Sequence, residues 1–372
     1  MCTAAKDGIC VNQGEKKVEV KNRTQSRLWQ YDALRIFSVF CMMLLHVAAA
    51  RWDQEPVQSL AWQVFNFYDS AMRFCVPVFV MLSGVFFLDK NRSYTLRTLL
   101  TKNILRIVTA FIFWSAAYSV LDNLFEYQTI NGDFFRSAAN QFLKGHFHMW
   151  FLFIIVGLYL LVPILRKISE DKKLTEYFIV LALVFNSILP MLQLIPPLKS
   201  IVKFYVYELD LHMVMGFSGL FLAGQYFNTY PVSRRLKGII YTLGALSIPF
   251  TVCLTSAISL KDGAPSKALY DYLGLNVVFT AVSVFLLFKD RAAKLNPSPR
   301  IRKITSLLAR LSFGMYLVHD FVNILLVKFL HITTVSFNPV FSVPLITALV
   351  FCISFAITYC ISKIPVISKY II

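Results

Sequence analysis

The sequence contains few charged residues for its length, and few of those are acidic. Only 15% of its 372 residues are Asp, Glu, Lys or Arg, and 20 acidic residues stand against 37 basic ones. Since 57% of the residues are hydrophobic, the chain is too apolar for an ordinary soluble domain. The 34 Phe and 17 Tyr residues agree with a helical protein that crosses a membrane several times.

Several motifs of other chemistries are absent. The seven Cys residues form no C-x-x-C pair and lie mostly in apolar runs, unlike a zinc or disulfide framework. The sequence has no glycine-rich phosphate loop, no Ser nucleophile elbow, no H-E-x-x-H motif and no internal repeat. Its first thirty residues are polar and mixed in charge, unlike a signal peptide. We therefore expect no metal, and we expect the first apolar run to be retained as a helix.

Ten apolar stretches are long enough to span a bilayer. They lie near 31–50, 64–88, 103–121, 148–166, 174–194, 211–228, 237–259, 271–288, 304–327 and 340–362. The sequence thus predicts an all-α, polytopic helical membrane protein with about ten transmembrane helices. A polar tail over 1–29, expected to be unstructured or loosely bound at the surface, precedes a membrane domain over 30–372.

The positions of the basic residues predict the orientation in the membrane. If the tail is cytoplasmic, the cytoplasmic segments hold 25 of the 37 Lys and Arg residues and the outer loops hold eight. The other four, Arg35, Arg73, Arg106 and Arg310, fall within spans. Because basic residues favour the cytoplasmic side, we expect both termini there. The net charge of +17 then reflects topology, and no nucleic-acid partner is expected.

The first span carries two ionisable residues on one face. Eleven residues at about 100° each bring His46 to within roughly 20° of Arg35, about 16 Å farther along the helix. Ionisable groups inside a bilayer are costly and mark functional sites. In the predicted orientation Arg35 lies near the inner surface and His46 near the outer one. The alternative is that Arg35 snorkels to the headgroups and His46 is an ordinary packing residue.

This arrangement suits a donor with a charged head and a long arm. Guanidinium groups bind phosphate in a bidentate manner, and an imidazole can act as general base on a hydroxyl. We therefore predict coenzyme A, whose long arm ends in the acyl thioester, as the carrier, held by Arg35, Arg73 and Arg310, with Arg73 also stabilising an oxyanion. The alternative for Arg73 is an ion pair with Asp69, one turn away. Transient acylation of His46 stays open.

Four ordered stretches resemble the acyltransferase-3 family of integral-membrane O-acyltransferases. The first is Arg35-x₁₀-His46, and the others are Arg73-Phe-Cys-Val-Pro77-Val-Phe-Val-Met-Leu-Ser83-Gly84, His148-Met-Trp150-Phe-Leu with Leu-Val-Pro163-Ile, and Ser312-Phe-Gly314-Met-Tyr316-Leu-Val-His319. The resemblance covers about residues 30–362. The combination is most similar to the branch that O-acetylates bacterial surface glycans, such as enterobacterial common antigen.

The resemblance implies a multi-pass protein of the bacterial cytoplasmic (inner) membrane. Such an enzyme moves an acetyl group from cytoplasmic acetyl-CoA to a hydroxyl of a surface glycan, or of its lipid-linked precursor, at the outer side. His46 is then the catalytic residue and Arg35 is essential to it. Secondary candidates, as acceptor contacts or as partners of these residues, are His148, His319, Asp320 and Asp32.

Three of the secondary candidates have a structural alternative, and the function has two alternatives. His148 and His319 could be hydrogen-bonded packing residues, and Asp32 could cap the first helix. The first alternative function is a transporter or flippase of a glycan or small anion, in which Arg35 and His46 line a path through the lipid bilayer. Transporters often have broken helices, and the sequence shows none, which favours the enzyme. The second alternative is transfer of a succinyl rather than an acetyl group.

Overall fold

The computed structural model describes residues 13–92, 94–126, 130–209 and 216–372. In this part of the chain every regular element is helical and no strand is present. Eight helical segments are long and apolar enough to cross a membrane: Trp29–Ala49, Leu60–Phe87, Leu96–Glu126, Gly132–Glu170, Lys172–Leu192, Arg234–Asp262, Pro299–Leu330 and Pro339–Ser362. The prediction of an all-α, polytopic membrane protein is therefore confirmed.

The other two predicted spans, 211–228 and 271–288, correspond to α12 and α14, which have 12 and 17 residues and are shorter than each of these eight segments; residues 210–215 lie outside the described part. In chain order the α-helices are α1 (Gln13–Ala49), α2 (Leu60–Met72), α3 (Cys75–Phe87), α4 (Leu96–Thr98), α5 (Leu105–Glu126), α6 (Gly132–Lys144), α7 (Trp150–Glu170), α8 (Lys172–Leu183), α9 (Leu189–Leu192), α10 (Lys199–Leu209), α12 (Ser218–Thr229), α13 (Arg234–Asp262), α14 (Leu275–Arg291), α15 (Pro299–Leu330), α16 (Pro339–Ser362) and α17 (Pro365–Ile371).

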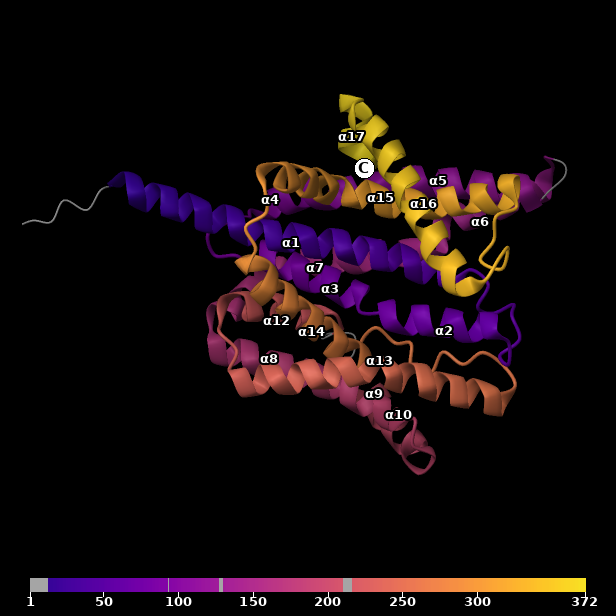
Figure 1. Cartoon of the computed structure of the whole chain (residues 1–372), viewed down its shortest axis with the longest axis horizontal. Coiled ribbons are helices and arrows are strands. Elements are labelled where there is room, and N and C mark those ends of the chain that lie inside the picture. Colours follow the sequence, from indigo (N-terminus) through magenta and orange to yellow (C-terminus); the bar gives the residue numbers. More distant parts are fainter. Residues whose placement is uncertain (1–12, 93, 127–129, 210–215) are drawn as a thin grey trace, which may run out of the picture.

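Helix α1 is the centre of the molecule. It packs against α2, α3, α14, α15 and α16, and Figure 1 shows it running along the long axis between them. Leu34, Met43 and Ala48 on α1 are completely buried. The helix that carries Arg35 and His46 is thus packed against several other helices along the part that crosses the membrane.

The polar tail is helical over much of its length, because α1 already begins at Gln13. An unstructured tail is therefore contradicted for residues 13–29, whereas a loose association with the surface stays a prediction. This stretch contains Gln, Glu and Lys residues, which favour helix, and extending an existing helix avoids the cost of a new nucleus.

The second span is broken in its middle. Helix α2 ends at Met72 and α3 begins at Cys75, so Arg73 and Phe74 lie between two half-helices. Pro77 is the cause, because it has no N–H to donate to the carbonyl of Arg73 and its ring crowds that carbonyl. The prediction that the chain has no broken helix is therefore wrong.

Helix α3 packs closely against α12 through two glycines. A Cβ atom at Gly84 would lie 1.8 Å from the carbonyl oxygen of Phe221, and one at Gly224 would lie 2.0 Å from that of Met81. Small residues allow such close approach of helices in membranes. The contact holds α3, which is the C-terminal half of the second span, against the rest of the bundle.

Candidate active site

A cavity of about 270 Å³ lies beside the half of α1 that carries Arg35. Its lining includes Arg35 from α1, Lys102 and Arg106 from the N-terminal part of the third span, Leu96–Glu126, and Tyr316 from α15. Three basic side chains around one mostly apolar cavity form a site suited to a phosphate-bearing ligand.

The two arginines differ in whether their guanidinium groups already donate hydrogen bonds within the protein. Arg106 Nε and Nη2 donate to the main-chain oxygen of Ile372 at 2.9 and 2.6 Å. Arg35, in contrast, makes no hydrogen bond or ion pair with any residue that the structure describes. Its guanidinium lies 5.2 Å from the centre of the Phe86 ring. Arg35 therefore has all its donors available for a ligand in this cavity.

At the other half of α1, His46 is paired with His319. His46 Nδ1 lies 2.7 Å from His319 Nε2, and His319 Nδ1 lies 2.6 Å from the carbonyl oxygen of Tyr316. Because a carbonyl only accepts, His319 carries its proton on Nδ1, and its Nε2 is then an acceptor when the ring is neutral. His46 in turn donates from Nδ1. The chain of contacts leaves His46 Nε2 unprotonated, with a lone pair that can accept a proton.

A second cavity, of about 400 Å³, opens beside His46. We call it the outer cavity, and the first one the inner cavity. The polar residues in its lining are His46, Asp122, His146, Asp320, Asn323 and Lys328. The side chain of Phe147, which is 62% exposed, also lines it. Its ring centre lies 5.6 Å from that of His46. A polar ligand in this cavity would be next to the imidazole that can take its proton.

A second pair of histidines lies at the outer cavity, which His146 lines, whereas His148 is buried. His146 Nδ1 and His148 Nδ1 are 2.9 Å apart, and the main-chain oxygen of His148 accepts a hydrogen bond of 2.7 Å from Tyr316 Oη. Among the described residues, the group that could hold a metal ion is His146, His148 and Asp320, whose ligand atoms lie within 4.8 Å of one another. The hydrogen bond between the two rings occupies one nitrogen of each.

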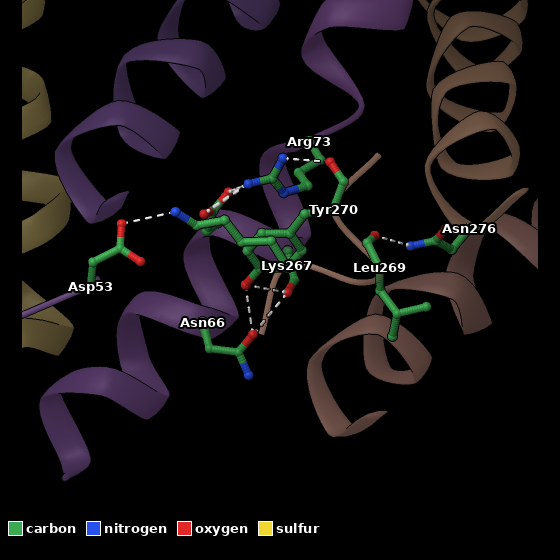
Figure 2. Close-up of polar contacts among 9 residues, drawn as sticks. Asp53, Asn66, Arg73, Lys267, Leu269, Tyr270 and Asn276 are labelled. Carbon is green, nitrogen blue, oxygen red and sulfur yellow. Dashed lines mark hydrogen bonds and ion pairs between the residues drawn. The ribbon is translucent and has the colours of Figure 1, made fainter. Parts of the chain in front are cut away.

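Arg73 is held by its neighbours and lines neither cavity. Its Nη2 lies 2.9 Å from Asp69 Oδ1, and its Nη1 donates to the carbonyl oxygen of Tyr270 at 2.7 Å (Figure 2). The guanidinium also lies 3.7 Å from the centre of the Tyr270 ring. Burial raises the pKa of Tyr270, so its hydroxyl remains protonated and donates to Asn66 Oδ1 at 2.8 Å. The ion pair with Asp69, the alternative for Arg73, is present.

Of the remaining predicted residues, Asp320 lines a cavity, whereas Arg310 and Asp32 do not. Arg310 is exposed on α15 and lines neither cavity, whereas Lys102 and Arg106 line the inner one. Asp32 lies inside α1, which begins at Gln13, so it cannot cap that helix. Asp320 lines the outer cavity, one residue beyond His319.

Several residues of the cavities were not expected from the sequence, among them Lys102, Asp122 and Phe147. Of these, Asp122 offered a usable signal, because it is an acidic residue at the end of an apolar run. Lys102 directly precedes an apolar run, where the sequence indicates a basic residue of a cytoplasmic loop. Phe147 is one of 34 Phe residues, and nothing in the sequence distinguishes it.

Fold and site together define a multi-pass helical membrane protein with a basic inner cavity and a histidine-lined outer cavity. The sequence family described as an acyltransferase domain, Acyl_transf_3, matches residues 28–362. Since this is nearly the whole chain, the protein belongs to the acyltransferase-3 family and is a membrane acyltransferase. No curated protein and no solved structure matched the chain.

Proposed function

We propose that the protein is an O-acetyltransferase of the bacterial inner membrane. It takes the acetyl group from cytoplasmic acetyl-CoA and transfers it to a hydroxyl of a surface glycan or its lipid-linked precursor at the outer side. The observation that carries this proposal is the contact chain from His46 through His319 to the Tyr316 carbonyl. It orients a basic nitrogen, His46 Nε2, in a ring that borders a cavity large enough for a polar ligand.

The reaction needs one base that also acts as an acid. His46 Nε2 removes the proton of the acceptor hydroxyl while its oxygen attacks the thioester carbon. The tetrahedral intermediate then expels the thiolate of coenzyme A, which takes the proton from His46. The acetyl ester and free coenzyme A are the products, and His46 returns to its neutral form. His319 acts through His46 by holding its ring and its tautomer.

The inner cavity is the proposed donor site. The unpaired guanidinium of Arg35 binds a phosphate of coenzyme A, and Lys102 adds a second positive charge. Tyr316 lines the inner cavity, and its hydroxyl bonds the main chain of His148 near the His46 ring. The thioester arm must cross this layer to reach His46, about 16 Å from Arg35 along α1.

The arrangement of helix ends supports the proposed orientation. Figure 1 shows the N-terminal ends of α1, α13 and α15 on one side of the molecule. Basic residues gather at the starts of these helices: Arg234 and Arg235 open α13, and Arg300, Arg302 and Lys303 open α15. Because basic residues favour the cytoplasmic side, this end is the proposed cytoplasmic face, with Arg35 near it.

A transporter is the second candidate, and the broken second span favours it, since such helices often form substrate sites in transporters. In this chain, however, the charged residue at the break, Arg73, is already bound to Asp69 and Tyr270. The family match to acyltransferases also favours the enzyme. The two functions differ in one measurable property, which is turnover of acetyl-CoA.

The test uses the full-length protein, purified in detergent, with labelled acetyl-CoA and a surface glycan freed of its O-acetyl groups by mild alkali. We expect the glycan to become labelled by the wild-type protein and not by His46→Ala, because the base is lost. His331→Asn is the matched control, since His331 is exposed and lines neither cavity. Full labelling by His46→Ala would contradict the mechanism. Labelled succinyl-CoA in a parallel reaction determines the acyl group.

A further inference from the structure

Two carboxylates in the outer cavity lie near a histidine, but at distances longer than an ordinary hydrogen bond. Asp320 Oδ2 lies 3.5 Å from His146 Nε2, and Asp122 Oδ2 lies 3.6 Å from the same atom. Hydrogen bonds between N–H and oxygen usually span about 2.7–3.2 Å. The other oxygen of Asp320 receives only a long contact of 3.4 Å from Asn323 Nδ2. Both carboxylates therefore have lone pairs that the protein leaves poorly satisfied.

Asp320 is also buried, with only 7% of its side chain exposed. Among the described residues, no Lys or Arg nitrogen lies within the 4.0 Å that defines an ion pair from either Asp320 or Asp122. A buried carboxylate with weak partners is costly, and the cost is higher within a membrane span. Such a group is expected where a ligand completes its hydrogen bonds.

The chemistry of the cavity indicates what that ligand is. Carboxylates accept hydrogen bonds and repel other anions, so the part of the ligand beside them must offer donors and carry no negative charge, although Lys328 also lines the cavity. A saccharide offers one donor from each hydroxyl. Phe147 adds an apolar surface beside these oxygens, with its ring centre 4.7 Å from that of His146. An apolar wall with a few convergent polar groups is typical of sites for small polar ligands.

We propose that Asp320 and Asp122 hold a sugar of the acceptor in the outer cavity. This inference rests on the proposed function for the reaction and adds the residues that recognise the acceptor. Each carboxylate accepts a hydrogen bond from a hydroxyl near the one that faces His46 Nε2, while Phe147 packs against the C–H face of the ring. The two carboxylates position the acceptor and do not take its proton, which goes to His46.

The proposal is tested by binding of the glycan alone. The full-length protein is titrated with the alkali-treated glycan in the absence of acetyl-CoA, so that the result does not depend on catalysis. We expect Asp320→Asn and Asp122→Asn each to weaken binding about tenfold or more, because each loses a charged hydrogen-bond acceptor. Asp133→Asn is the matched control, since Asp133 is an exposed aspartate on α6 outside the cavity. Its affinity should equal that of the wild type.

Steady-state transfer adds a second measurement. The two variants should raise KM for the glycan and leave kcat and the affinity for acetyl-CoA nearly unchanged, which also shows that they are folded. Glycan binding that survives both substitutions overturns the proposal, whether or not the protein transfers acetyl groups. A fall in kcat at constant KM also overturns it, because the carboxylates would then act on the histidines. So does a stoichiometric divalent ion in the purified protein that is lost in Asp320→Asn.

Discussion

His46 and His319 lie 273 positions apart in the sequence, yet their rings meet through Nδ1 of the first and Nε2 of the second at 2.7 Å. The second nitrogen of His319 is bound to the carbonyl of Tyr316, on the same helix. This one contact joins the central helix α1 to α15. It also determines which nitrogen of His46 is free to accept a proton, so it connects the packing of two helices to the proposed chemistry.

Replacing His319 should therefore damage turnover without removing the base. In His319→Leu the His46 ring loses its hydrogen-bond acceptor and can adopt either tautomer. We expect kcat for acetyl transfer to fall about 10²-fold or more, within the range that general-base catalysis contributes. His319→Gln should retain more activity, because its amide can both accept from His46 and donate to Tyr316. Acetyl-CoA binding should be normal in both variants, and a normal kcat in His319→Leu would exclude the positioning role.

Arg35 should determine the affinity for the donor. Losing one charge-assisted phosphate contact costs roughly 1.5–3 kcal/mol, so Arg35→Ala should bind acetyl-CoA about ten- to a hundredfold more weakly. Arg35→Lys should recover only part of this loss, because an ammonium lacks the planar fork. Calorimetric titration of the purified protein measures the effect. Arg310→Ala is the control, since Arg310 is exposed and outside the cavity, and an equal loss there would show a general effect of charge.

The contact between α3 and α12 should be a main contribution to stability. Gly84→Ala places a Cβ 1.8 Å from the carbonyl oxygen of Phe221, so the two helices must separate and lose contacts. We expect a lower Tm in detergent. Gly157→Ala is the matched control on α7, because a Cβ there meets nothing within 4 Å. That variant should be neutral or slightly more stable, since Ala favours helix over Gly. Equal Tm values for the two variants would contradict the close packing.

Much of the fold could be predicted from hydropathy, because every membrane span must be apolar over its whole length. The face shared by Arg35 and His46 could be predicted from helical periodicity alone. The contacts between helices could not be predicted in this way. The sequence near His46 does not indicate that His319 is its partner. The Tyr316 carbonyl belongs to the main chain, so no side chain indicates its role.

Arg106 and Arg310 show why the inner cations were only partly identified. Both are arginines near the start of an apolar run, so their local sequence signals are alike. Arg106 lines the inner cavity because of the helix face on which it lies, and this depends on how α5 packs against α7 and α17.

The break at Arg73 could not be predicted for a different reason. Pro77 lies four residues beyond the break, and its effect is exerted on the carbonyl of Arg73.

Arg73 was expected to contact the oxyanion, and its ion pair with Asp69 allows this role to be separated from a structural one. Removing one partner of a buried pair leaves an uncompensated charge and costs about 3–5 kcal/mol, so Arg73→Met and Asp69→Leu should each lower Tm strongly. The double variant should be more stable than either single one, because neither charge is then left unpaired. From the geometry we expect it to regain acetyl transfer as well, since Arg73 lines neither cavity. A double variant that regains Tm but stays about 10²–10³-fold less active would instead assign Arg73 to the oxyanion.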